Sequence, residues 1–99
     1  NISTVEIENV LYTHPDVLEV AVISVPDEKW GEVPKAFIVP RAGTNPDPAE
    51  IIAYCKEKMA RFKAPKSIEF GPLPKTATGK LQKFKLREKE WEGHDRMVN

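Results

Sequence analysis

One segment of the sequence combines residue types that suit the binding of an anion. Residues 74–81 read Pro-Lys-Thr-Ala-Thr-Gly-Lys-Leu, in which two turn-forming residues accompany two hydroxyls and two lysines. A loop of this composition can present backbone N–H groups, hydroxyls and ammonium groups on one side, which suits a phosphate or a carboxylate. Gly79 allows the backbone to approach a ligand closely, and Lys80 beside it can project a cation. The pattern alone favours a solvated surface loop, because Gly-Lys is common in loops, and anion binding stays open as the alternative.

The charge distribution directs attention to the same half of the chain. The 99 residues contain 15 Lys and Arg against 15 Asp and Glu, and a net charge of zero argues against nucleic acid as the main partner. Residues 1–50 hold 3 basic and 9 acidic residues, a balance of −6, whereas residues 51–99 hold 12 and 6, a balance of +6. We therefore expect the second half to face any anionic ligand, with a solvated lysine-rich surface as the alternative.

Length and cysteine content limit the classes of protein. A chain of 99 residues has room for one domain with a modest core. No apolar stretch approaches the roughly 20 residues of a membrane-spanning helix, and the N-terminus has no signal-peptide pattern. The single cysteine, Cys55, fits a small core residue in a reducing compartment, and the His and Cys spacing indicates no metal site. We expect a cytoplasmic domain that neither spans a membrane nor binds a metal.

The hydrophobic pattern predicts an α+β domain with a central three-stranded sheet flanked by two or three helices. One helix begins at Ser3, which forms a capping-box pattern with Glu6. Another begins at Asp47, with Pro48 in the first helical position, and is expected to run until Ala64-Pro65 stops it. The expected strands are residues 17–25, ended by Pro26-Asp27, then 33–39 and 67–70, and a terminal amphipathic segment covers residues 81–91.

The loop motif resembles a known family. Residues 74–83, Pro-Lys-Thr-Ala-Thr-Gly-Lys-Leu-Gln-Lys, closely resemble the last core motif of the adenylate-forming superfamily, which includes acyl-CoA synthetases, peptide-synthetase adenylation domains and luciferases. Further segments resemble the preceding family motifs, in family order: residues 1–8, 14–22, 26–36 and 62–65. The resemblance covers nearly the entire chain, and residues 1–99 are identified as the C-terminal lid domain of such a ligase. It implies a hinge and a large N-terminal domain upstream.

The resemblance implies a reaction in two steps. Family members join a carboxylate to the α-phosphate of ATP with release of pyrophosphate, and then transfer the acyl group to a thiol, usually that of CoA. ATP, CoA and a carboxylic acid are then the substrates, and Mg²⁺ is held by the large domain. Residues 70–74 and 82–87 look most like acyl-CoA synthetases for fatty or other small organic acids. The isolated chain is expected to be inactive.

Roles for individual residues also follow from the resemblance. A lysine at the position of Lys80 contacts the carboxylate and the nucleotide during adenylation and offsets their repulsion. The lid then rotates, which withdraws the loop and brings the opposite face to the thiol tunnel. The implied sites are Lys80 as the catalytic residue, Thr76, Thr78 and Gly79 in the nucleotide and substrate loop, and Ile2, Ser3 and Glu6 on the thiol-step face. Lys75, Lys83 and Lys85 are candidates for contacts to CoA phosphates, with plain surface lysines as the alternative.

Two other classes of function are compatible with the residues. The chain could be a free-standing α+β binding module that uses its basic half for an anionic partner. Nucleic acid fits this module poorly, because the basic residues are not interleaved with a clear set of stacking aromatics. It could also be a protein-interaction domain in which the Lys80 loop is solvated. A large domain with a phosphate-binding loop encoded upstream of Asn1 would favour the lid over both.

Overall fold

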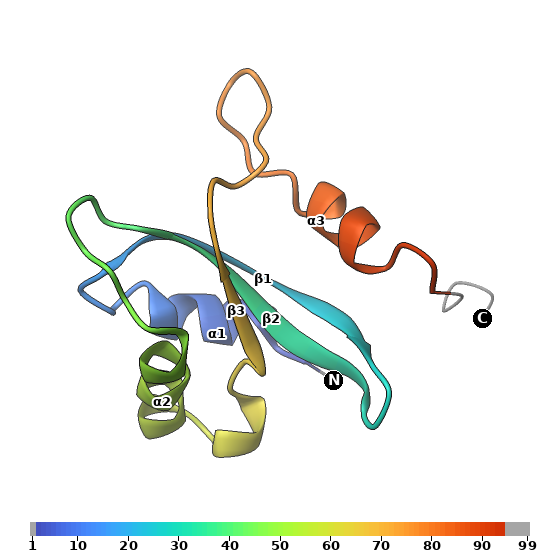
Figure 1. The fold of residues 1–99 in the computed structure, drawn as a ribbon, viewed down its shortest axis with the longest axis horizontal. Helices are drawn as coiled ribbons and strands as arrows, with labels where there is room; N and C mark the ends of the chain where they lie inside the picture. Colours follow the sequence, from blue (N-terminus) through green and yellow to red (C-terminus); the bar gives the residue numbers. More distant parts are fainter. Residues whose placement is uncertain (1, 95–99) are drawn as a thin grey trace.

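A three-stranded sheet with helices against it forms the framework of the protein (Figure 1). The computed structural model describes residues 2–94, so Asn1, the first residue of the 1–8 motif, lies outside it. The elements are α1 (Thr4–Leu11), β1 (Val17–Asp27), β2 (Gly31–Pro40), α2 (Pro48–Lys58), a 3₁₀ turn η1 (Arg61–Lys63), β3 (Ser67–Phe70) and α3 (Lys83–Glu90). The predicted α+β class and three-stranded sheet are confirmed.

The sheet is mixed, with strand order β1-β2-β3. β1 and β2 form an antiparallel hairpin, whereas β3 pairs with β2 in parallel through Lys35↔Ser67 to Ile38↔Phe70. A parallel pair needs a crossover connection, and α2 provides it. The hairpin turn is held by the Asp27 carboxylate, which accepts the N–H groups of Lys29 and Trp30 at 3.1 and 2.8 Å.

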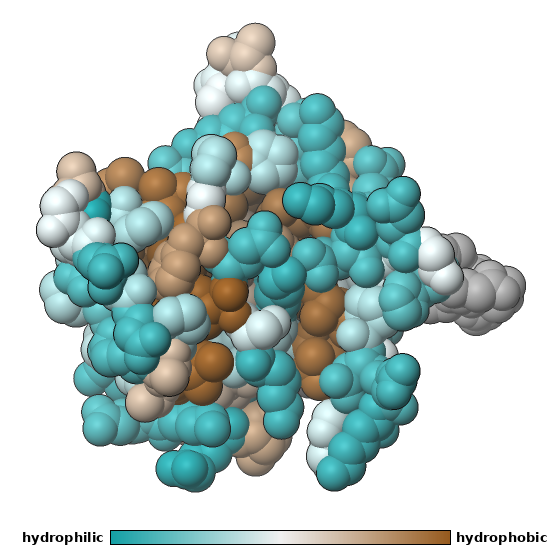
Figure 2. Space-filling model, in the orientation of Figure 1, coloured by the Kyte–Doolittle hydropathy of each residue, from teal (hydrophilic) through white to brown (hydrophobic). Residues whose placement is uncertain are grey.

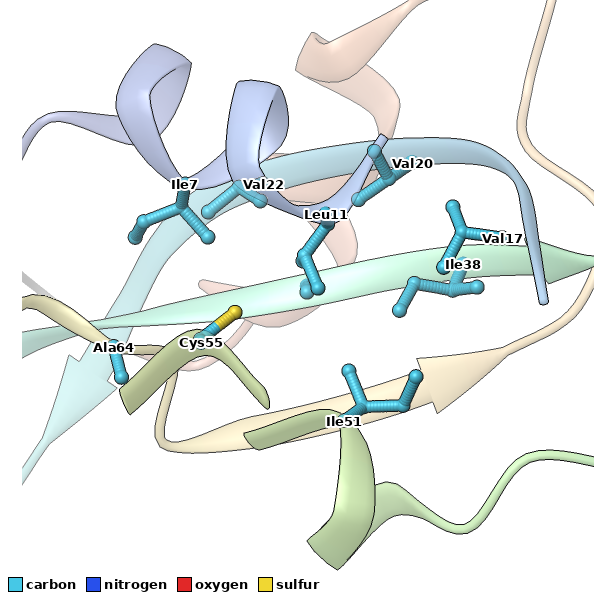
Figure 3. Close-up of a cluster of buried hydrophobic side chains, with 10 residues drawn as sticks. Ile7, Leu11, Val17, Val20, Val22, Ile38, Ile51, Cys55 and Ala64 are labelled. Atoms are coloured by element: carbon cyan, nitrogen blue, oxygen red, sulfur yellow. The ribbon is translucent and has the colours of Figure 1, made fainter. Parts of the chain in front are cut away.

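The central parts of β1 and β2 are buried on both faces of the sheet, which explains the nearly continuous apolar sequence of β1. On one face, α1 contributes Ile7 and Leu11 and α2 contributes Ile51 and Cys55, each pair at the i, i+4 spacing that places two side chains on one side of a helix (Figure 3). The other face is covered by α3 through Leu86. The residues buried with Leu86 on that face are Ala21, Ile23, Val25, Val33 and Phe37.

The free edge of β1 is covered by side chains of α1 and of the segment that follows α3. An unpaired strand edge exposes N–H and C=O groups that favour unwanted pairing or cost energy if buried. Here three alternate residues in the middle of β1, Val20, Val22 and Ser24, have such partners. Tyr12 Oη lies 3.4 Å from the backbone N and O of Val20, Glu8 Oε2 accepts the N–H of Val22 at 2.8 Å, and Trp91 Nε1 donates to the carbonyl of Ser24 at 2.9 Å.

Two predicted boundaries are wrong. Pro26-Asp27 does not end β1, which continues to Asp27 with Pro26 opposite Glu32. Pro26 follows Ser24 by two residues, so its nitrogen points to the free edge of β1 and no ladder hydrogen bond is lost. Helix α2 does not reach Ala64-Pro65, because Met59 is already extended at φ −150° and ψ 174°, and η1 forms a separate turn.

Cys55 is a core residue, as predicted, and its thiol should be chemically inert in the folded state. Its side chain is fully buried, and burial raises the pKa of the Cys55 thiol to about 11. Since only the thiolate reacts, alkylation by iodoacetamide at pH 8 should be roughly a hundredfold or more slower than for an exposed cysteine. The measurement is the labelling rate by mass spectrometry, with denaturant-unfolded chain as the control; equal rates would contradict the burial.

Candidate functional site

The segment singled out by its composition is a small closed hairpin. Lys75 and Leu81 form an isolated antiparallel bridge, and the Gln82 N–H donates to the Pro74 carbonyl at 2.9 Å. The loop is then tied across its tip: Thr76 N–H donates to Lys80 O at 2.8 Å, Gly79 N–H donates to Thr76 O at 2.9 Å, and Lys80 N–H donates to Thr76 Oγ1 at 3.0 Å. These bonds hold the chain between the two lysines in one shape.

Gly79 and the hydroxyls of Thr76 and Thr78 stabilise the shape of this hairpin. Gly79 has φ +91°, a backbone conformation that residues with a Cβ rarely adopt. The hydroxyl of Thr78 lies 3.1 Å from that of Thr76, which itself holds the Lys80 amide. The predicted nucleotide and substrate loop is therefore brought together as one unit. Three of its amides are used inside the loop, so its side chains are the main groups that it offers outward.

Lys80 lies at the exposed end of this unit. The loop stands away from the sheet, at the top of Figure 1, and residues 75–81 are all exposed. Figure 2 shows that the tip is pale, from white to light tan, and carries no strongly hydrophobic patch. Among residues 2–94 the Lys80 ammonium group makes no ion pair or side-chain hydrogen bond. The structure thus presents an unneutralised cation on a fixed loop.

The other predicted lysines differ in how far they are neutralised. Lys75 Nζ lies 2.7 Å from Glu19 Oε1 in β1, and Lys83 Nζ lies 2.6 Å from Glu8 Oε2 in α1. Lys85 makes no ion pair within the described part of the chain and lies at a cleft of about 360 Å³ between residues 69–74 and α3. Part of the basic charge of the second half is therefore balanced by the acidic first half.

Lys35 joins the two elements that the loop connects. Its Nζ lies 2.9 Å from Glu69 Oε1 in β3 and 2.9 Å from Glu90 Oε2 in α3. Burial by itself lowers the pKa of Lys35, but the hydrogen bonds to Glu90 and Glu69 outweigh it and raise the pKa above 10.5. The residue therefore stays charged near neutral pH, and β3 and α3 are held to the same point of β2.

A second group of predicted residues gathers far from Lys80. Ile2 and Ser3 line a small cavity of about 60 Å³ together with Pro34, Phe62 and Lys63. Ser3 caps α1 by accepting the Glu6 N–H at 3.3 Å, while the Glu6 carboxylate pairs with Lys63 at 3.5 Å. In Figure 1 this region, near the N-terminus and η1, lies at the opposite end of the view from the Lys80 loop.

Sequence reasoning placed Phe62 in the family motif at residues 62–65 but gave it no role in binding. Its side chain is 83% exposed, the most exposed of the large hydrophobic residues, and Arg61 and Lys63 on either side are exposed as well. An exposed aromatic ring between two cations is a combination that suits a ligand with both an aromatic ring, which can stack, and phosphates, which the cations attract. The signal present in the sequence was this triplet, which reads Arg-Phe-Lys just before Ala64-Pro65.

His14 belongs to the scaffold. It is buried, with Nε2 at 3.0 Å from Glu50 Oε2 and Nδ1 accepting the Asp16 N–H at 3.0 Å. Because Nδ1 accepts, the ring hydrogen lies on Nε2 and is donated to Glu50.

Within residues 2–94 no group of three or more His, Cys, Asp and Glu side chains could hold a metal ion, and no helix there is long and apolar enough to cross a membrane.

Comparison with known proteins identifies the family to which the chain belongs. The profile of the AMP-binding enzyme C-terminal domain matches residues 6–80, and the chain belongs to this family. Acetate–CoA ligase CCL3 of Humulus lupulus is 51% identical over 94 residues, which are 90% of this chain and 16% of the relative. Acetate/butyrate–CoA ligase AAE7 of Arabidopsis thaliana, described as peroxisomal, is 50% identical over 94 residues, with the same shares of 90% and 16%.

Solved structures of related enzymes contain the same fold. ATP-bound MatB from Rhodopseudomonas palustris superposes with a TM-score of 0.86 at 34% identity, over 96% of this chain and 19% of that one. The fatty acyl CoA synthetase of Mycobacterium tuberculosis gives a TM-score of 0.81 at 42% identity, over 90% and 18%. The chain therefore spans less than a fifth of each of these four relatives, and it corresponds to a domain of acyl-activating ligases.

The closed form of the loop can be tested through the amide of Lys80. Thr76→Val keeps the side-chain shape but removes the acceptor of that amide. Loss of one such hydrogen bond, worth about 1 kcal/mol, should speed hydrogen exchange of the Lys80 amide roughly fivefold. Amide exchange by NMR measures it, with Thr78→Val as the control, because the Thr78 hydroxyl does not hold this amide. An unchanged rate in Thr76→Val would show that the loop is not closed in this way.

Proposed function

We propose that this chain is the mobile C-terminal lid of an ATP-dependent acid–CoA ligase. The parent enzyme would convert ATP, a carboxylic acid and CoA into acyl-CoA, AMP and pyrophosphate. Fatty acids or other small organic acids are the proposed substrate class, and the relatives named above include ligases for acetate, butyrate and fatty acyl groups. The acid, the nucleotide and its Mg²⁺ would be bound chiefly by a large N-terminal domain. We propose a cytoplasmic location.

The observation that carries this proposal is the unneutralised Lys80 ammonium group on a closed, projecting loop. Adenylation brings a carboxylate against a triphosphate, so like charges must be forced together. A lysine on a long flexible stem can reach between them as a point charge and stabilise the charge that develops at the phosphorus. Lys80 would act by electrostatics and positioning, not as a nucleophile, and Thr76, Thr78 and Gly79 would set the direction of its approach.

The thiol step is proposed for the opposite end of the domain. Ile2, Ser3 and Glu6 lie beside Phe62 and Lys63, far from Lys80. A rotation of the lid between the two steps would exchange one end for the other at the active site of the large domain. The basic and aromatic surface at Arg61–Lys63 supports this proposal, because CoA carries an adenine ring and phosphates.

Substitution of Lys80 tests the adenylation step. In the full-length parent, Lys80→Ala should lower carboxylate-dependent ATP–pyrophosphate exchange roughly a hundredfold or more, the scale for loss of one charge-stabilising contact. Lys56→Ala, which removes an exposed lysine from α2, is the matched control and should leave exchange unchanged. Exchange that survives in Lys80→Ala would show that Lys80 is a surface lysine without a role in adenylation. It would favour the hypothesis of a free-standing binding module.

Substitution of Phe62 tests the thiol step separately. Phe62→Ala should raise the KM for CoA roughly tenfold, since stacking on an aromatic ring contributes about 1–3 kcal/mol per base. ATP–pyrophosphate exchange should not change, because CoA takes no part in it. The comparison uses steady-state acyl-CoA formation and exchange on the same preparation. A Phe62→Ala enzyme with a normal KM for CoA would remove Phe62 from the thiol-step face.

A further inference from the structure

One ion pair lies on each side of the Lys80 loop, at the two ends of its hairpin stem. Before the loop, Lys75 Nζ is 2.7 Å from Glu19 Oε1, and after it, Lys83 Nζ is 2.6 Å from Glu8 Oε2. Both glutamates belong to the body of the domain, in β1 and α1. The loop is thus tied at both ends to elements that lie far from it in the sequence.

The Glu8–Lys83 pair is held in place by a further hydrogen bond. Glu8 also accepts the Val22 N–H at 2.8 Å, so its carboxylate is fixed by β1 before it meets Lys83. The Glu8 and Lys83 side chains are only 16% and 25% exposed, which limits their screening by solvent. The Glu19 and Lys75 side chains are more exposed, at 32% and 37%, but are also in direct contact at 2.7 Å.

The position of Lys80 depends on the orientation of the hairpin stem. The tip is internally bonded, and the stem is closed by the Lys75↔Leu81 bridge and by the Gln82 to Pro74 bond. A unit that is stiff inside can still tilt at its base, which would carry the Lys80 ammonium group away from its target. A misplacement of about 1 Å can cost a reaction as much as a hundredfold, so contacts that fix the orientation of the stem matter to any reaction that uses Lys80.

We propose that Glu19 and Glu8 are positioning residues for adenylation, which hold the Lys80 loop in its working orientation through Lys75 and Lys83. This inference rests on the proposed function of Lys80. It also gives Lys75 and Lys83 a role different from the predicted contacts to CoA phosphates, since their charges are already matched by carboxylates. Lys85, which has no acidic partner within residues 2–94, keeps the phosphate role as its prediction.

The experiment uses the full-length parent enzyme with Glu19→Gln and, separately, Glu8→Gln. Glutamine keeps the size of each side chain, and at position 8 its carbonyl can still accept the Val22 N–H, so the edge of β1 stays satisfied. Each substitution should lower kcat for ATP–pyrophosphate exchange roughly tenfold, with little change in the KM for ATP. Acyl transfer to CoA from preformed acyl-adenylate should change less than about twofold, because the loop is withdrawn in that step.

A charge exchange separates orientation from general stability. Glu19→Lys and Lys75→Glu should each impair pyrophosphate exchange, and the double variant should recover it to within about threefold of wild type. Glu57→Gln on α2, an exposed glutamate without an ion pair among the described residues, is the control and should behave as wild type. Melting temperatures are recorded for all variants, and the inference requires the exchange defect in proteins that melt as wild type does.

The outcomes distinguish this inference from the function on which it rests. If Lys80→Ala abolishes exchange while Glu19→Gln and Glu8→Gln leave it intact, the positioning role is wrong and the proposed function stands. If Lys75→Gln raises the KM for CoA with normal exchange, Lys75 is a phosphate contact and the inference is likewise overturned. If Lys80→Ala itself leaves exchange intact, the proposed function fails, and the positioning role fails with it.

Discussion

The need to cover β1 on both faces and along its free edge determines where the other elements lie. A three-stranded sheet has little interior, and β1 carries apolar side chains on both sides. Helices α1 and α2 cover one face, so α3 must cover the other, where Leu86 packs and Trp91 donates to the edge at Ser24. The chain between β3 and α3 must therefore pass from the sheet to its second face, and the Lys80 hairpin is part of that connection.

Ion pairs between the two halves of the chain then join elements that packing has brought close together. The acidic first half and the basic second half meet in the pairs Glu6–Lys63, Glu19–Lys75 and Glu8–Lys83. The more exposed of these pairs, such as Glu6–Lys63, contribute little to the free energy of folding, typically about 0–1 kcal/mol each. We infer that these pairs orient the segments that carry the proposed chemistry, because they join those segments to α1 and β1. Lys80 differs from these lysines in having no acidic partner among residues 2–94.

Local patterns predicted the elements well and the contacts between distant residues poorly. Ser3 and Pro48 marked helix starts because capping and proline geometry act within one turn, and the loop motif around Lys80 was visible as a string of residues. The end of β1 was misplaced because the tolerance of Pro26 depends on its facing a free edge. The partners of Lys75 and Lys83 could not be foreseen, since Glu19 and Glu8 reach them only through the tertiary fold.

The central claim is that a fixed loop delivers the Lys80 charge to the adenylation site. A crystal structure of the full-length parent bound to a non-hydrolysable acyl-adenylate analogue would test it most directly. The account predicts Lys80 Nζ within about 3 Å of an oxygen of the analogue, with the pairs to Glu19 and Glu8 still formed. A Lys80 side chain that remains in solvent while the analogue is bound in an adenylation-competent enzyme would contradict it.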